Sequence, residues 1–96
     1  MHGEYKVPGG KLVVADLDVA DGRLVGVRIS GDFFLEPDTA LDAINDVLCG
    51  LPANTGEAAL TAAVQGALDA DVSMYGITPD AVAVVVRRAI DAGAAP

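Results

Sequence analysis

The sequence predicts an α+β domain, in which an antiparallel β-sheet of two to three strands carries three helices on one face. Two observations support this prediction. Over the first third of the chain, apolar and polar residues alternate, which is the period-2 pattern of half-buried strands. After Phe34, apolar residues recur at intervals of three and four, as they do along one face of a helix.

Length and composition restrict the class of protein. Ninety-six residues are expected to form one domain, residues 1–96. The net charge of −8 argues against a nucleic-acid partner and against an anionic membrane surface. A single cysteine excludes an internal disulfide. Because the N-terminus is polar and no apolar run is long enough to cross a bilayer, we expect a cytoplasmic protein.

The strands are expected to follow one another closely. A short strand over His2–Val7 is followed by a turn at Pro8–Gly10, and Lys11–Val19 is the second strand. The third strand covers Arg23–Ser30 and is expected to direct three side chains to the core: Val25, Val27 and Ile29.

The connection between the second and third strands has two possible registers. A two-residue turn at Asp21–Gly22 would pair Val19 with Leu24 and place the two apolar rows on opposite faces. A three-residue loop, Ala20–Gly22, pairs Leu17 with Val25 and keeps both rows on one face. The hydrophobic pattern therefore favours the three-residue loop.

Three helices are expected after the strands. The first begins at Leu35–Asp38, and its apolar stripe is Leu41, Ile44, Val47 and Leu48. The second is expected over about Gly56–Asp69, with Asn54 and Glu57 forming a capping box. Its apolar stripe is Leu60, Val64 and Leu68.

The third helix has the clearest start. After a connector at Asp71–Ile77, Thr78 is placed to cap the helix and Pro79 occupies its first position. Its inner face is expected to consist of Val82, Val85, Val86, Ala89 and Ile90. The tail from Gly93 is expected to fray.

Few residues suggest chemistry of their own. His2, the single histidine, lies at a terminus and pairs with no candidate nucleophile. Asp16, Asp18 and Asp21 do not follow a calcium-loop pattern and are interpreted as a solvated acidic face. Gly9-Gly10-Lys11 enters a strand, as a tight turn does, whereas a phosphate loop enters a helix. Contact between Lys11 and a ligand held by a partner stays open.

Cys49 is interpreted as a partly buried structural residue. It lies near the C-terminal end of a predicted helix, whereas a thiolate nucleophile is favoured at an N-terminal end. Phe33 and Phe34 have two interpretations of equal weight. Either both are buried, or one enters the core while the other is exposed as an anchor for a partner. With no self-contained active site, a binding or accessory module is favoured over an enzyme.

Two motifs then carry a resemblance. The run Lys6-Val7-Pro8-Gly9-Gly10-Lys11-Leu12, followed by a hairpin and by Gly31-Asp32-Phe33-Phe34, resembles the accessory (C-terminal) domain of lipoate–protein ligases. The resemblance is strongest to the form that is a separate small subunit, and it covers nearly the whole chain. The family fold is the small α+β one shared with sulfur-acceptor and iron–sulfur scaffold proteins.

The resemblance implies a function through a partner. In this family a catalytic subunit binds lipoate, ATP and Mg²⁺, forms lipoyl-AMP, and passes the lipoyl group to acceptors such as E2 subunits and the H protein. The small subunit has no catalytic residues and no cofactor of its own; it docks on the catalytic subunit and enables the activation step. The early position of the motif, close to Met1, suggests a free-standing subunit.

Carried over by motif, eight positions are expected to face the partner: Lys6, Gly9, Gly10, Lys11, Gly31, Asp32, Phe33 and Phe34. The lysine at position 11 could approach the phosphates of a nucleotide held by that partner. Two alternatives stay open. One is a sulfur-acceptor protein that uses Cys49, and the other is a scaffold or regulatory domain without a ligase partner.

Overall fold

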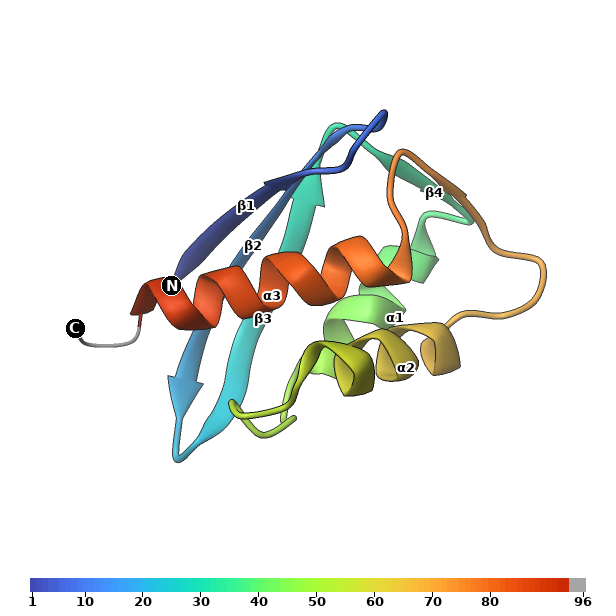
Figure 1. Ribbon diagram of the computed structural model, residues 1–96. Helices are drawn as coiled ribbons and strands as arrows, with labels where there is room; N and C mark the ends of the chain where they lie inside the picture. Colours follow the sequence, from blue (N-terminus) through green and yellow to red (C-terminus); the bar gives the residue numbers. More distant parts are fainter. Residues whose placement is uncertain (94–96) are drawn as a thin grey trace.

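The computed structural model describes residues 1–93, which form a sheet with a layer of helices on one face (Figure 1). The main sheet is antiparallel, with strand order β1-β2-β3, and a second sheet pairs β4 with β5. The strands are β1 (His2–Lys6), β2 (Leu12–Ala20), β3 (Arg23–Gly31), β4 (Phe34–Glu36) and β5 (Ser73–Tyr75). The helices are α1 (Thr39–Leu48), α2 (Glu57–Ala67) and α3 (Pro79–Gly93). The predicted α+β architecture is confirmed.

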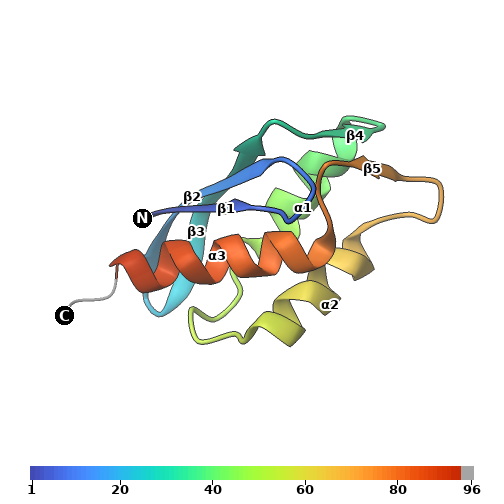
Figure 2. The same cartoon turned by 45° about the horizontal axis from the view of Figure 1, so that its top comes forward.

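The helices share one apolar core with the sheet. α3 lies across β1 and β2, α1 lies against β3, and α2 packs on the other two helices (Figures 1 and 2). The sheet contributes Val13, Ala15, Leu17, Leu24, Val27 and Ile29, and the helices contribute Ile44, Leu48, Leu60, Val64, Val82, Val85, Val86 and Ala89. Within residues 1–93 no polar or charged side chain is buried. The core is therefore held by burial of small aliphatic groups.

The hairpin between β2 and β3 differs from the prediction. Its turn has two residues, Asp21 and Gly22, and Val19 pairs with Leu24, so the predicted three-residue loop is wrong. Both turn residues have positive φ, 53° and 75°, as a type I′ turn requires. The chain therefore adopts the register of the two-residue turn, which the hydrophobic pattern disfavoured.

A β-bulge explains how this register still buries both apolar rows. The pairing shifts between Asp16 and Asp18, so that two residues of β3, Gly26 and Val27, oppose a single residue of β2. Gly26 has φ 60°, a conformation that favours glycine. One extra residue at this point returns the following side chains to the core face.

The bulge also changes which side chains of β3 face the core. Leu24 is fully buried, whereas Val25 is 38% exposed, the reverse of the predicted arrangement. Val27 and Ile29, beyond the bulge, are buried as predicted. A strict period of two fails in β3 because the strand is not regular along its whole length.

Of the two predicted helix caps, one is confirmed and one is wrong. In α3, the Thr78 hydroxyl accepts a hydrogen bond of 3.1 Å from the Ala81 N–H, which confirms the predicted cap. The capping box at Asn54 is wrong, because Gly56 occupies the N-cap of α2 without a side-chain bond. The neighbouring Thr55 hydroxyl instead donates back to a carbonyl in its own turn.

The ends of α2 and α3 also differ from expectation. α2 ends at Ala67, two residues before the predicted end. Gly93 is the last residue of α3, and the rest of the tail expected to fray, residues 94–96, lies outside the described residues. No helix in the described chain has the length and apolar character needed to cross a bilayer.

The second sheet has no counterpart in the sequence prediction. β4 lies where the start of the first helix was expected, and β5 lies within the predicted connector. Leu35 pairs with Met74 and faces the core, while Phe34 pairs with Tyr75 on the opposite side. This small sheet extends the fold beside the end of β3.

Candidate functional site

The two motifs singled out in the sequence meet at one end of the sheet, where the β1–β2 turn lies beside the exit of β3 (Figures 1 and 2). The Asp32 N–H donates a hydrogen bond of 3.1 Å to the Leu12 carbonyl. Gly31 has φ 145°, and a Cβ there would collide with that same carbonyl oxygen. A glycine is therefore required for the two segments to approach this closely.

The β1–β2 turn is closed by its own backbone. The Gly10 N–H donates to the Val7 carbonyl at 2.8 Å, and the Val7 N–H donates to the Lys11 carbonyl at 3.1 Å. Gly9 has φ 70° and lies exposed at the turn. The segment returns into β2 and does not lead into a helix, so the predicted tight turn is confirmed.

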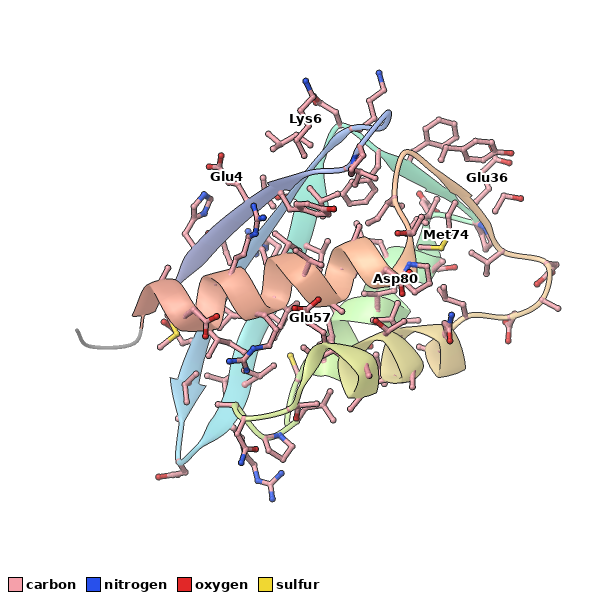
Figure 3. All side chains as sticks on the ribbon, in the orientation of Figure 1. Glu4, Lys6, Glu36, Glu57, Met74 and Asp80 are labelled. Carbon is pink, nitrogen blue, oxygen red and sulfur yellow. The ribbon has the colours of Figure 1, made fainter. Side chains whose placement is uncertain are left out.

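A third segment joins this end of the molecule. Gly76, with φ 82°, follows β5, and a Cβ at this position would lie 2.7 Å from Lys11 Cγ and 3.5 Å from Phe33 Cβ. The Lys11 stem thus lies against the Gly76 backbone, and Lys11 remains an exposed residue. The Lys6 side chain extends from the same end (Figure 3). Both cations are available to a partner.

The two phenylalanines have different environments, which decides between the two interpretations of the pair. Phe33 is partly buried and packs against the core, whereas Phe34 is 56% exposed. The Phe34 ring stacks on Tyr75, with centroids 4.5 Å apart and an interplanar angle of 17°. Tyr75 is 45% exposed. The site therefore presents a rigid aromatic pair to solvent.

Sequence reasoning missed Tyr75 and Gly76 as members of this site. A signal was available in Ser73-Met74-Tyr75, where an apolar residue lies between two polar ones as in a short strand. Nothing local identifies β4 as its partner, because the two strands are far apart in sequence.

His2 belongs to a separate cluster on the outer face of the sheet. Its Nε2 lies 2.7 Å from Glu4 Oε2, and its Nδ1 lies 2.7 Å from Asp16 Oδ1. Hydrogen bonds to Glu4 and then to Asp16 raise the pKa of His2 above its ordinary value, since both carboxylates favour the imidazolium. Both ring nitrogens contact carboxylates, so the cluster is an exposed ionic network.

The acidic residues of the hairpin do not converge on one point. Asp16 bonds to the histidine ring, Asp18 lies 3.7 Å from the N-terminal ammonium group, and Asp21 is in the turn. Within residues 1–93, no three His, Cys, Asp or Glu side chains are grouped so that they could hold a metal ion. The same residues enclose no pocket for a small molecule.

Cys49 is a free, exposed residue at the C-cap of α1, so the expectation of partial burial is wrong. The chain leaves the helix at Cys49, whose backbone is extended, and Gly50, with φ 91°, donates its N–H to the Leu24 carbonyl at 2.7 Å. The C-terminal end of a helix does not favour an anion. The position of Cys49 gives no support to the sulfur-acceptor alternative.

Comparison with known proteins bears on the fold. No family model and no curated protein matches the sequence. One similar chain belongs to a structure described as an archaeal lipoylation system, a bi-partite lipoate protein ligase and its E2 lipoyl domain from Thermoplasma acidophilum. The two chains share a fold. The TM-score is 0.69 with 23% identity, over 91% of this chain and 98% of the other. The resemblance stated from the two motifs is thus confirmed at the level of fold.

Proposed function

We propose that this chain is the non-catalytic accessory subunit of a split lipoate–protein ligase. It docks on a catalytic subunit and enables that subunit to convert lipoate and ATP into lipoyl-AMP, from which the lipoyl group passes to a lysine of an acceptor protein. The E2 subunits of 2-oxoacid dehydrogenases and the H protein are the proposed acceptors.

One observation carries the proposal. The motif around Lys11 and the Gly31–Phe34 motif lie side by side at one end of the fold. This fold is shared with a chain from a bi-partite lipoate protein ligase system, and the match spans almost the full length of both chains. The absence of a pocket within residues 1–93 is compatible with a subunit whose partner holds the substrates.

The chemistry of the shared end suits a supporting role. Activation of a carboxylic acid by ATP forms a bond between the carboxylate and the α-phosphorus and releases pyrophosphate, so negative charge develops on phosphate oxygens. Lysine ammonium groups stabilise such charge when they are held in place. We propose that Lys11, whose stem lies against the Gly76 backbone, approaches the phosphates of a nucleotide bound by the partner.

The test is lipoyl-AMP formation by a catalytic ligase subunit from the same source. Lipoate and Mg-ATP are incubated with that subunit, with and without this chain, and pyrophosphate release is measured. We expect activation only when the chain is added. Activation indifferent to the chain, together with separate elution of the two proteins, would refute the proposed function.

A pair of variants tests the role of Lys11. We expect Lys11→Ala to reduce activation by about 100-fold or more, as found when one charge-stabilising donor is removed. Arg28→Ala is the matched control, because Arg28 is also an exposed cation but lies on β3 opposite Asp16. Full activation with Lys11→Ala would remove Lys11 from the mechanism and leave the accessory role intact.

A further inference from the structure

Charge is distributed unevenly along this chain. Between Arg28 and Arg87 there is no lysine or arginine, while nine carboxylates occur: Asp32, Glu36, Asp38, Asp42, Asp46, Glu57, Asp69, Asp71 and Asp80. The other five acidic residues share the rest of the chain with all six lysines and arginines. The net charge of −8 therefore comes entirely from one stretch of sequence.

Most of this stretch lies on one side of the molecule, and only its α1–α2 connection reaches the hairpin, where Arg23 and Arg87 donate to its carbonyls. It builds β4, α1, α2, β5 and the start of α3, which lie together in both views (Figures 1 and 2). All nine carboxylates are exposed, and Glu36 and Asp80 are labelled on this side in Figure 3. Within residues 1–93 none of the nine takes part in an ion pair. We call this side the acidic half.

The stacked pair of Phe34 and Tyr75 lies in the acidic half. Among the large hydrophobic side chains of residues 1–93, these two are the most exposed. Their backbones are positioned by the pairing of β4 with β5 and by the burial of Leu35, and their rings stack on each other. Rigid aromatic side chains lose little conformational freedom on binding, and aromatic residues with a polar rim are typical of the centre of an interface.

We infer that the acidic half, centred on Phe34 and Tyr75, is the surface that docks on a basic face of the catalytic ligase subunit. This inference rests on the proposed function and identifies the surface and its partner's charge. Unneutralised like charges repel one another, so a basic partner face is complementary to them. Phe34 and Asp32 also belong to the Gly31–Phe34 motif, which makes the docking surface continuous with the end that carries Lys11.

The first experiment tests the aromatic anchor by calorimetric titration of the catalytic subunit with this chain. We expect Phe34→Ala and Tyr75→Ala each to weaken binding by about 30-fold, the loss typical of an interface hot spot. Val25→Ala is the control, because Val25 is 38% exposed but lies on β3 outside the acidic half. It is expected to change the dissociation constant by less than about twofold.

The second experiment tests charge complementarity with two triple variants that remove the same charge. One is Glu36→Gln, Asp42→Asn, Asp46→Asn in the acidic half, and the other is Asp16→Asn, Asp18→Asn, Asp21→Asn in the hairpin. Wild-type association is expected to slow about 10-fold or more between roughly 50 and 300 mM salt. The first triple variant should flatten this dependence, and the second should leave it unchanged.

Each outcome has a defined meaning. If the wild-type chain does not bind the catalytic subunit at all, the proposed function fails, and this inference with it. If it binds but the aromatic and acidic-half variants bind equally well, docking uses another face and only this inference is overturned. Binding to a lipoyl acceptor domain through these residues, but not to the ligase, would overturn the assigned partner. Circular dichroism shows whether each variant is folded. If an aromatic variant is unfolded, the test rests on the charge variants.

Discussion

Two exposed glycines allow the irregular geometry of β3 to be tested by one kind of substitution. At both Gly26 and Gly66, a Cβ would have no heavy atom within 4 Å, so an alanine meets no steric obstacle. The backbones differ, since Gly26 is the bulge residue with φ 60° and Gly66 lies inside α2. The sign of each effect on stability therefore depends on the backbone alone.

The magnitudes follow from known preferences. In a helix interior, alanine is favoured over glycine by about 1 kcal/mol, and Gly66 lies in the last turn of α2, so Gly66→Ala should stabilise the protein by up to that amount. The left-handed conformation at Gly26 costs a residue with a Cβ about 1–2 kcal/mol. Reduced freedom of the unfolded chain returns about 0.4–1 kcal/mol of this. Gly26→Ala should therefore destabilise by about 1 kcal/mol, and the two variants should differ by about 1–2 kcal/mol.

Urea unfolding followed by far-ultraviolet circular dichroism measures both changes, since the chain has no tryptophan. In a domain of this size, 1 kcal/mol corresponds to about 4–8 °C in melting temperature, so thermal scans provide a second readout. Stabilisation by Gly26→Ala would refute the bulge and with it the register of the hairpin. A destabilising Gly66→Ala would refute the exposed position of that residue in α2.

Two further predictions concern titration and helix capping. The pKa of His2 is raised in the folded protein by Glu4 and Asp16, so its contribution to stability is full below about pH 6.5 and is lost as the pH rises through the raised pKa. His2→Gln should remove this part of the pH dependence in urea titrations, and an unchanged pH profile would contradict the network. Thr78→Ala should destabilise by about 1 kcal/mol through loss of the α3 cap, whereas Thr78→Ser should not; equal losses would contradict the cap.

Local sequence patterns were sufficient to predict much of the fold. In β2, Val13, Ala15 and Leu17 face the core, and Asp16 and Asp18 face solvent, as the period-2 pattern predicts. The α3 start was also predictable, because Thr78 and Pro79 each meet a positional requirement of a helix N-terminus. These features depend on neighbours in sequence.

The errors arose where the outcome depends on competition between interactions. A regular strand would have required the three-residue loop, but Gly26 permits a bulge, and a type I′ turn then becomes compatible with burial of Leu24. Asn54 had the spacing of a capping box, yet the chain uses Gly56 at the N-cap. In each case the local sequence was compatible with two conformations, and only the packing of the whole chain decides between them.

The candidate site was predictable as two motifs but not as a surface. A family resemblance drew attention to Lys11 and Phe34, whose segments do meet. Tyr75 could not be inferred as a partner of Phe34, since β4 and β5 are three residues each and pair across two intervening helices, α1 and α2. Strands this short carry almost no periodic signal, so the aromatic pair emerges only from tertiary structure.

The residues of this end divide into those that shape the fold and those that face outward. Gly76→Ala would force a Cβ to within 2.7 Å of Lys11 Cγ at a positive φ, so it should both destabilise the domain and displace the lysine. Phe34 contributes little to the core because more than half of it is exposed. Its replacement by alanine should leave the melting temperature within a few degrees of wild type, as surface changes usually do. Loss of activation by Phe34→Ala in a fully folded protein would then be evidence about the partner surface, whereas the same loss by Gly76→Ala would not.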